Sequence, residues 1–234
     1  MRLSNEGVYI ITGGAGALAN AVAGVFREAG ARLALVDVEE AAVRERAEAL
    51  GALPIVADLT SPAAAGRMVA ETKSRYGGVD GLIHTAGAFT MASAHESDMA
   101  LYDRMFDLNM RTLFCATRAV LPIFLEQRDG FVAGISTNLV WSGAGGAGMS
   151  LYAAAKGAVT LFLRSLEREL RAQGIRVALV YPLSSIDTPA NRRAMPDADP
   201  EGWVDPVEIA NALLFASTRG RRGRLVELPI AVAR

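Results

Sequence analysis

A tyrosine and a lysine four residues apart, Tyr152 and Lys156, have the clearest potential for proton-transfer chemistry in this chain. Residues i and i+4 share one face of a helix, so both side chains can point into the same cleft. A free phenol has a pKa of about 10, and a neighbouring ammonium group lowers that pKa because it stabilises the phenolate. A tyrosine tuned toward neutral pH can pass a proton to a carbonyl oxygen or an imine nitrogen. The opposing interpretation is an amphipathic helix that presents both side chains to solvent.

A glycine-rich turn near the N-terminus could hold a phosphate group. The sequence TGGAGALA, residues 12–19, follows an apolar run and opens an Ala-rich segment. Glycines in such a turn bring backbone N–H groups close to a pyrophosphate at a helix N-terminus. Ala17 and Ala19 stand where this pattern often has glycine, so the pattern is only partly kept.

Asp37 ends the second apolar run and could bind a ribose. Dinucleotide-binding proteins carry such a carboxylate about 20 residues after the glycine-rich turn, where it binds the adenosine ribose. Glu39 and Glu40 follow and no arginine replaces Asp37, so a 2′-phosphate would meet like charge. This pattern predicts NAD rather than NADP. The alternatives for Asp37 are a solvated charge at a strand end and the N-cap of the next helix.

The elements that must position these residues alternate along the chain. Short runs rich in Val, Ile and Leu predict strands at 8–12, 32–37, 53–57, 81–85, 130–136, 176–181 and 224–232. Helical patterns occupy 17–30, 39–51 and 62–77, and the last two end in glycine, which suits a helix C-terminus. Strands that are apolar on both faces predict a parallel sheet covered by helices, hence a doubly wound α/β fold. Ligands bind outside the carboxyl ends of the strands in such folds.

Length and composition narrow the possible function classes. The chain has 234 residues, which we interpret as one domain, and its net charge of −1 predicts no binding to nucleic acid. The single cysteine, Cys115, excludes an internal disulfide and is expected to be a packing thiol. With only His84 and His95, no metal site is expected. Neither a signal sequence nor a membrane-spanning run is found, so we expect a soluble, cytoplasmic protein.

Taken together and in order, the motifs resemble the short-chain dehydrogenase/reductase family over nearly the whole chain. The matching stretches are TGGAGALA (12–19), ADL (57–59), HTAG (84–87), DLNM (107–110), YAAAK (152–156) and DTP (187–189). The resemblance implies a Rossmann-like fold with a seven-stranded parallel sheet, an NAD-dependent oxidoreductase activity and a small-molecule substrate. Because helices like the one that starts near Tyr152 pair between subunits in this family, the resemblance also implies a homodimer or homotetramer.

The resemblance assigns roles residue by residue. It implies that Tyr152, Lys156 and Asn109 are catalytic, that Lys156 also binds the nicotinamide ribose, and that Thr188 binds near the nicotinamide amide. His84 replaces the family's usual asparagine, and we expect a buried ring satisfied by the backbone. The implied cofactor-binding residues are Thr12, Gly13, Gly14, Gly16, Ala17, Leu18, Asp37, Asp58 and Leu59 (at the adenine), Ala86, Gly87, Tyr152, Lys156, Pro182 and Thr188.

The hydroxyl that assists the family's tyrosine is displaced in this chain. Family members commonly carry a serine thirteen residues before the tyrosine, and that position here is Leu139. Alignment from the preceding strand instead places Thr137 at the serine position, with a loop two residues longer than usual. We therefore expect Thr137 to be the catalytic hydroxyl, ahead of Ser136 and then Ser142.

Residues 187–203 carry a narrower resemblance, to the segment after the sixth strand in quinonoid dihydropteridine reductase. That branch prefers NADH and keeps the Tyr/Lys pair without the usual serine, so we expect a substrate lid around residues 184–204 and reduction of a C=N bond. Thr137 and Asn109 favour an ordinary ketone/alcohol or 3-oxoacyl reductase instead. A dinucleotide-sensing protein that kept the fold and lost turnover is a further alternative.

Overall fold

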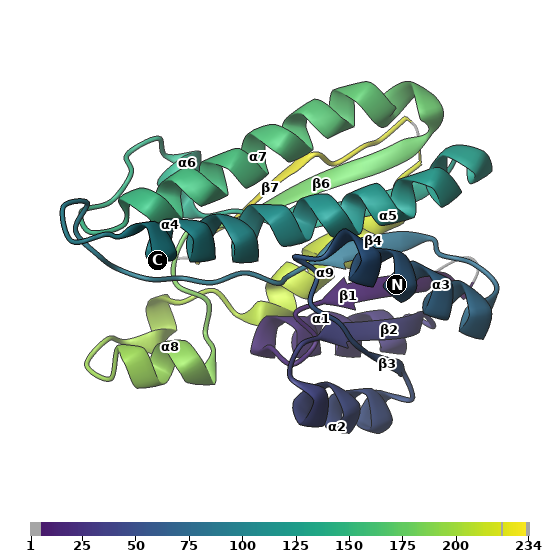
Figure 1. Cartoon of the computed structure of the whole chain (residues 1–234), viewed down its shortest axis with the longest axis horizontal. Coiled ribbons are helices and arrows are strands. Elements are labelled where there is room, and N and C mark those ends of the chain that lie inside the picture. The colour runs from purple at the N-terminus through teal and green to yellow at the C-terminus, as the bar shows by residue number, and fades with distance from the viewer. Residues whose placement is uncertain (1–5, 221, 233–234) are drawn as a thin grey trace.

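Seven parallel strands form one sheet between two layers of helices in the computed structural model, which describes residues 6–220 and 222–232 (Figure 1). The strands are β1 (Val8–Thr12), β2 (Arg32–Asp37), β3 (Leu53–Val56), β4 (Gly81–His84), β5 (Gly130–Ile135), β6 (Ile175–Pro182) and β7 (Glu227–Ile230). Their order across the sheet is β3-β2-β1-β4-β5-β6-β7, and every neighbouring pair is parallel. The predicted strands and the doubly wound, Rossmann-like fold of a single domain are therefore confirmed.

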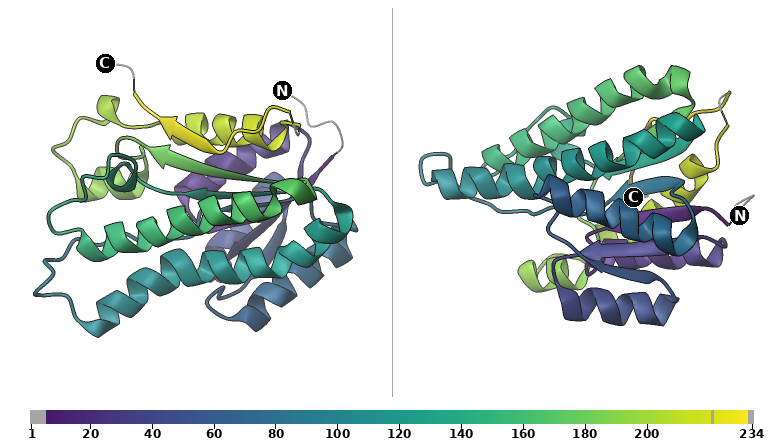
Figure 2. Two further views of the ribbon diagram at one scale, coloured as in Figure 1. Left: turned by 90° about the horizontal axis from the view of Figure 1, so that it is seen from above. Right: turned by 45° about the vertical axis from the view of Figure 1, so that its right-hand side comes forward.

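The helices divide between the two faces of the sheet. They are α1 (Ala17–Glu28), α2 (Glu40–Leu50), α3 (Pro62–Tyr76), α4 (Met99–Phe106), α5 (Thr112–Gln127), α6 (Asn138–Trp141), α7 (Ser150–Leu170), α8 (Pro189–Ala194) and α9 (Pro206–Ser217). Residues of α3, α5 and α7 share one buried core with the sheet, and residues of α1, α2 and α9 share the other. Figure 2 shows α5 and α7 side by side along one face. Within β1, Ile10 belongs to the first core and Ile11 to the second, which explains why the strands lack polar alternation.

Capping residues decide where several helices begin and end. Ser61 begins α3, because its Oγ accepts a hydrogen bond from the N–H of Ala64 at 3.4 Å. Gly51 and Gly77 end α2 and α3 with left-handed φ angles of 60° and 87°. The two glycines predicted as helix C-termini therefore have the conformation that this role requires.

The strand order reverses between β1 and β4. The chain proceeds from β1 outward to β2 and β3, then crosses to β4 on the other side of β1 and continues outward to β7. The loops that leave the carboxyl ends of β1 and β4 therefore run in different directions. Open α/β sheets bind their ligands in the crevice at such a point.

A long helical stretch, Met99–Gln127, contains a π-helical turn at Asp107–Arg111. By length and a mean hydropathy of 1.2 alone, this stretch is apolar enough to cross a membrane, which the sequence prediction missed. In this fold, however, α5 packs against α3 and places Leu113, Ala116 and Val120 in the first core. No other helix in the described ranges passes the same test. Burial inside the domain explains these inward-facing apolar residues, whereas Phe114 on the same helix is 46% exposed.

Residues 184–204 form an excursion that leaves the sheet after β6 and carries α8 (Figure 1). Two backbone hydrogen bonds of 2.8 Å close its base, from Asp187 N to Val204 O and from Val204 N to Ser185 O. Ser184 adds a hydrogen bond from its Oγ to the carbonyl of Gly202 at 2.7 Å. The segment expected to be a lid is thus a closed loop with its own base.

Candidate functional site

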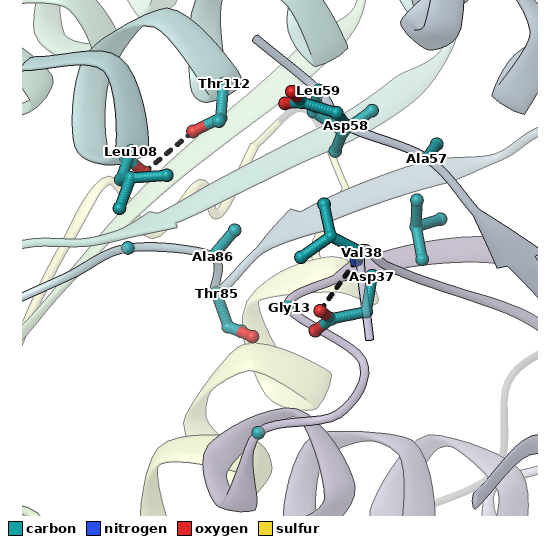
Figure 3. Close-up of a pocket in the computed structure, with 13 residues that line it drawn as sticks. Gly13, Asp37, Val38, Ala57, Asp58, Leu59, Thr85, Ala86, Leu108 and Thr112 are labelled. Atoms are coloured by element: carbon teal, nitrogen blue, oxygen red, sulfur yellow. Dashed lines mark hydrogen bonds between the residues drawn. The ribbon is translucent and has the colours of Figure 1, made fainter. Parts of the chain in front are cut away.

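A cavity of about 270 Å³ opens at the carboxyl ends of the first four strands (Figure 3). It is lined by Gly13, Gly16, Val36, Asp37, Val38, Ala57, Asp58, Leu59, Thr85, Ala86, Gly87, Leu108 and Thr112. The predicted cofactor residues that the structure brings together here are Gly13, Gly16, Asp37, Asp58, Leu59, Ala86 and Gly87. The others lie outside this lining: Thr12, Gly14, Ala17, Leu18, Tyr152, Lys156, Pro182 and Thr188. The volume lies below the roughly 300–1,000 Å³ of most ligand pockets, so the cavity is too small to enclose a large ligand completely.

The turn after β1 lies so close to the loop after β4 that glycine is required. Gly13 has a φ of +71°, and a Cβ at this position would lie 2.8 Å from the backbone nitrogen of Ala86. Gly16 is the N-cap of α1 and makes no side-chain cap, so the N–H groups of the first turn stay available to an anion. Ala17 begins α1, where its methyl group is accommodated. This turn fits the phosphate role that the sequence indicated.

The carboxylate of Asp37 braces the turn. Its Oδ2 accepts a hydrogen bond from the N–H of Ala15 at 2.9 Å. Its Oδ1 accepts from the N–H groups of Val38 at 2.7 Å and Glu39 at 3.1 Å. Because α2 has Glu39 at its N-cap position, the alternative of Asp37 as that N-cap is wrong. Oδ2 retains acceptor capacity for one further donor, such as a ribose hydroxyl.

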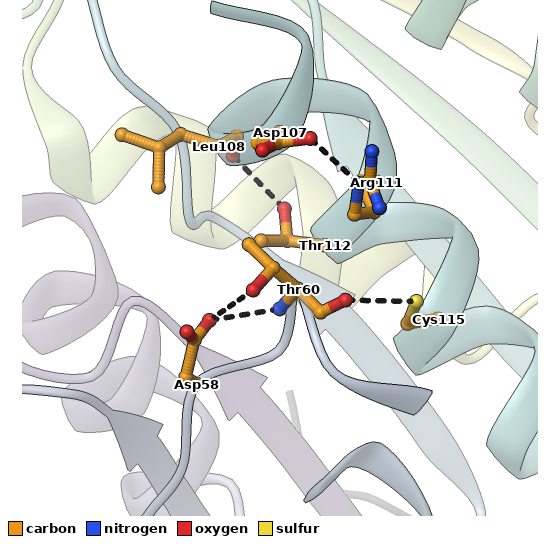
Figure 4. Close-up of polar contacts among 7 residues, drawn as sticks. All are labelled: Asp58, Thr60, Asp107, Leu108, Arg111, Thr112 and Cys115. Atoms are coloured by element: carbon orange, nitrogen blue, oxygen red, sulfur yellow. Dashed lines mark hydrogen bonds and ion pairs between the residues drawn. The ribbon is translucent and has the colours of Figure 1, made fainter. Parts of the chain in front are cut away.

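Short-range hydrogen bonds fix another side of the cavity (Figure 4). Asp58 Oδ1 accepts from the Thr60 N–H at 2.9 Å and from the Thr60 hydroxyl at 2.7 Å. The thiol of Cys115 lies behind this loop, with its Sγ 3.9 Å from the Thr60 carbonyl oxygen. Burial raises the pKa of the Cys115 thiol, which leaves it protonated and unreactive, in line with the packing role expected.

Tyr152 and Lys156 both lie on α7, and the lysine is buried. The side chain of Lys156 is 8% exposed, and its Nζ donates a hydrogen bond to the carbonyl of Ile135 at 3.0 Å. A Cβ on Gly87 would lie 3.3 Å from that Nζ. The lysine therefore joins the end of β5 to the loop that lines the cofactor cavity. The interpretation in which Lys156 points to solvent is wrong.

The structure distinguishes the three candidate hydroxyls. Ser136 is buried and its Oγ lies 2.7 Å from the hydroxyl of Thr160, so it faces the interior. Ser142 is exposed and donates to the carbonyl of Asn138 at 2.8 Å. Thr137 stands at the N-cap of α6, and its hydroxyl lies near enough to the phenol of Tyr152 to lower the pKa of that phenol. Thr137 is the hydroxyl that the fold places beside Tyr152.

The pKa values of the pair depart from the expectation for a lysine-tuned tyrosine. Burial raises the pKa of Tyr152 above its ordinary value, and the hydrogen bond with Thr137 only partly offsets that rise. Burial also lowers the pKa of Lys156 to about 8. Loss of hydration thus dominates at both groups. The expected lowering of the Tyr152 pKa by the Lys156 ammonium is wrong for the protein without ligand.

Asn109 lies in the π-helical turn Asp107–Arg111 and is buried. Its Nδ2 donates to the carbonyl of Ala88 at 3.0 Å and to that of Met105 at 2.9 Å. Its Oδ1 accepts from the N–H of Ala88 at 3.4 Å. The side chain is therefore engaged with the backbone on both sides of Ala88, and it fixes the loop after β4 rather than pointing freely into a cleft.

His84 is satisfied by hydroxyl groups, so the expectation of backbone partners is wrong. Its Nδ1 lies 2.9 Å from Thr12 Oγ1 and its Nε2 lies 3.2 Å from Thr112 Oγ1. Thr112 donates its own proton to the carbonyl of Leu108 at 2.9 Å, so we assign the ring proton to Nε2. Burial and the positive charge of Lys156 lower the pKa of His84 to about 3. A neutral imidazole thus ties β1 to the helix that follows the π-helical turn.

Sequence reasoning assigned no role to two residues of the site. Thr112 and Leu108 line the cavity, and although Leu108 stands in the DLNM motif, that motif indicated a role for Asn109 only. They reach the site because the loop after β4 and the α4–α5 stretch fold over the crevice. A hydroxyl or apolar residue in such a segment carries no spacing signal that could have found it.

Sequence comparison identifies the family of this chain. A sequence profile described as short chain dehydrogenase matches residues 7–199. The chain belongs to the short-chain dehydrogenase family. Members of this family generally bind NAD or NADP, and the close approach of Gly13 to Ala86 forms the kind of cradle that such a cofactor needs. Within the described residues, no group of three or more His, Cys, Asp or Glu could hold a metal ion.

Relatives of this short-chain dehydrogenase align along most of its length. Levodione reductase of Leifsonia aquatica is 33% identical over 97% of this chain and 85% of that protein. A Xanthobacter autotrophicus protein named inactive 2-(S)-hydroxypropyl-CoM dehydrogenase 2 is 34% identical over 80% of this chain and 87% of its own. The crystal structure of gox2181 has a TM-score of 0.87 and 27% identity, covering 97% of this chain and 95% of that chain. The chain is thus similar along its length to oxidoreductases of one fold.

Proposed function

We propose that this short-chain dehydrogenase is an NAD(H)-dependent enzyme that interconverts a small ketone and the corresponding alcohol. The observation that carries the proposal is the position of the Thr137 hydroxyl, at the N-cap of α6, beside the phenol of Tyr152. Two adjacent hydroxyl groups that can each donate a hydrogen bond suit a carbonyl oxygen that gains negative charge during reduction. The name of levodione reductase, a relative that covers nearly the whole chain, also indicates a ketone substrate.

The chain's own residues would divide the binding of NAD(H). The glycine-rich turn and the first turn of α1 suit the pyrophosphate, because their N–H groups can donate to its oxygens. Asp37 suits the adenosine ribose and would repel a 2′-phosphate, which favours NAD over NADP. Lys156 lies beside Gly87 and suits the nicotinamide ribose. The bound cofactor would supply or accept the hydride.

Proton transfer would belong to Tyr152. Its raised pKa keeps the phenol protonated at neutral pH, so it is ready to donate a proton to a ketone oxygen. The Thr137 hydroxyl would hold the same oxygen by a second hydrogen bond. Lys156, with a pKa of about 8, is mostly protonated at neutral pH and adds positive charge near the reacting groups. Asn109 would keep the loop at Ala88 in place.

Two other functions remain as hypotheses that the same assay can test. The pterin hypothesis rests on the sequence of residues 187–203 and on the lid role of residues 184–204, and neither relative named above is called a pterin reductase. One observation supports the hypothesis of a dinucleotide-binding protein without turnover, since a relative at 34% identity is named inactive. Intact Tyr152, Lys156 and Thr137 side chains favour turnover over that alternative.

The assembly and location are also proposals. Phe114 on α5 and Leu161 on α7 are 46% and 63% exposed, although both are large apolar side chains. Such exposure on two neighbouring helices suits contact with a second copy, so we propose a homodimer or homotetramer in the cytoplasm. Sedimentation equilibrium would give the number of copies, and a monomer across the working concentration range would contradict the proposal.

The deciding experiment follows NADH oxidation with a panel of ketones, a 3-oxoacyl ester and quinonoid dihydropterin, each repeated with NADPH. The unmodified protein should reduce at least one ketone and prefer NADH. Thr137→Val keeps the shape and removes the hydroxyl, so kcat should fall by about 10²–10³-fold. Ser142→Ala is the matched control, because that hydroxyl faces Asn138, and kcat should stay nearly unchanged.

Each contrary result selects another function. Reduction of the dihydropterin alone would replace the ketone proposal by the pterin hypothesis. Binding of NADH without turnover of any substrate would favour the non-catalytic alternative. A Thr137→Val variant with the rate of the unmodified protein would remove Thr137 from the mechanism.

A further inference from the structure

The loop after β4 presents two large apolar side chains to solvent beside the catalytic tyrosine. Phe89 is 56% exposed and Met91 is 59% exposed. Exposed apolar side chains that gather at a reactive group usually mark a binding surface, because water contact with them is unfavourable. These two side chains therefore need an explanation that the fold alone does not provide.

The short segment that carries them is fixed at both ends. Ala88 is held by the side chain of Asn109, which both donates to and accepts from its backbone at 3.0 and 3.4 Å. Ala92 donates its N–H to the carbonyl of Gly148 at 2.8 Å, and Gly148 lies just before α7. A segment tied to the π-helical turn at one end and to the α7 entrance at the other holds its side chains in a defined place.

Phe89 contacts the ring of Tyr152 directly. The two ring centroids are 4.9 Å apart and the planes are perpendicular, at 90°, which is a favourable edge-to-face arrangement. Met91 leans toward the other loop, since a Cβ on Gly148 would lie 3.7 Å from its Cε. A substrate oxygen that reaches Tyr152 therefore brings its neighbouring atoms against an aromatic ring and a thioether.

One cation of the lid, Arg192, is compensated rather than offered to a ligand. The guanidinium of Arg192 on α8 binds both carboxylate oxygens of Asp187, at 2.6 and 2.7 Å. This ion pair holds the pKa of Asp187 below its usual range. An anionic substrate that sought Arg192 would have to displace Asp187, so Arg192 does not favour an anionic ligand.

We infer that Phe89 determines specificity and that the substrate is an uncharged ketone whose hydrocarbon part packs on Phe89 and Met91. This inference rests on the proposed ketone reduction at Tyr152. Hydrocarbon burial against an aromatic wall favours a ligand with an apolar ring or chain beside its carbonyl over a very small or charged one. Phe89 and Met91 contribute to substrate binding more than to the chemical step.

The test compares Phe89→Ala with Phe215→Ala, which removes another exposed phenylalanine ring, from the last turn of α9. Both variants and the unmodified protein are assayed with NADH on cyclohexanone, acetone and acetoacetate. The unmodified protein should use cyclohexanone best. Phe89→Ala should raise the KM for cyclohexanone about 10-fold or more, with kcat and the values for acetone nearly unchanged, because one lost apolar contact is worth about 10–200-fold. Phe215→Ala should change neither.

Two results would overturn the inference. One is a preference of the unmodified protein for acetoacetate over cyclohexanone. The other is a fall in kcat by the same factor for every ketone in Phe89→Ala, since Phe89 would then only support the position of Tyr152. A Phe89→Leu variant that restored the rates for all ketones equally would also show that Phe89 has only this supporting role. Calorimetric titration of cyclohexanone into the NADH-loaded protein distinguishes a failure of this inference from a failure of the proposed ketone reduction. If cyclohexanone binds in a way that depends on Phe89 but is not reduced, ketone reduction is refuted and the apolar binding site is retained.

Discussion

The burial of Lys156 makes the stability of this protein depend on pH in a direction that can be worked out. The pKa of Lys156 falls from 10.5 to about 8 in the folded chain because burial removes the ammonium from water. Between these two values the unfolded chain binds more protons than the folded chain, so the free energy of unfolding rises with pH. Below pH 8 the full cost of the buried charge is present, and above pH 10.5 it is gone.

The size of the effect follows from the same values. A fall in the pKa from 10.5 to about 8 corresponds to about 3.5 kcal/mol, at about 1.4 kcal/mol for each pH unit, and most of it falls between pH 7 and 10.5. Lys156→Met removes the titrating group and fills a similar volume. Between pH 7 and pH 10.5, the free energy of unfolding of the unmodified protein should therefore rise by about 3 kcal/mol relative to that of Lys156→Met. Loss of the hydrogen bond to Ile135 changes the free energy of unfolding of the variant by the same amount at every pH, so it does not alter this pH dependence.

The assay is urea unfolding of both proteins at several pH values, and the quantity compared is their difference. The chain has one other lysine, Lys73, which is exposed, so Lys73→Met is a matched control with no expected pH-dependent difference. With two lysines, the side-chain NMR titration of Lys156 can also be followed directly. A difference between the proteins that stays constant from pH 7 to 10.5, or a Lys156 titration near 10.5, would refute the reasoning.

The remaining predictions concern the cofactor carboxylate and the buried histidine. Asp37→Asn removes the negative charge while keeping a hydrogen-bond acceptor, so the preference for NADH over NADPH in fluorescence titrations should fall about tenfold. An unchanged preference in Asp37→Asn, or an equal fall in a Glu39→Gln control, would show that the Asp37 charge does not determine the cofactor preference. His84, with a folded pKa of about 3, binds protons more weakly than in the unfolded chain, so stability is lost as the pH falls below about 6.5. Between pH 6.5 and 4.5 the unmodified protein should lose about 2–3 kcal/mol relative to His84→Leu in urea unfolding, whereas the exposed His95 replaced by Leu should show no such slope. Parallel pH profiles of the unmodified protein and His84→Leu would show that the ring is not held neutral.

Much of the fold could be predicted from local patterns. The apolar runs predicted each strand to within three residues at either end, because a strand buried on both faces must be apolar along its whole length. Gly51 and Gly77 marked two helix ends, because the left-handed conformation there suits glycine best. The spacing of Tyr152 and Lys156 was likewise local, since one helix fixes it.

The hydroxyl beside Tyr152 shows where local patterns stopped being sufficient. Counting back from Tyr152 reached Leu139, and counting forward from the strand reached Thr137, so two registers competed. The α6 turn resolves them, because it absorbs the extra residues and leaves Thr137 at its N-cap beside Tyr152. A loop insertion has no periodicity, so only the folded structure of the loop could decide which hydroxyl lies beside Tyr152.

What the sequence by itself determined is the order of strands and helices and the residues at the strand ends, because burial and backbone preferences act over a few neighbours. What only the tertiary structure decided is which distant groups meet. His84 pairs with Thr12 across 72 positions, and Phe89 meets Tyr152 although no motif connects them. The tertiary structure also decided the direction in which the pKa of Tyr152 shifts. Desolvation depends on every neighbour that excludes water rather than on one lysine a helical turn away.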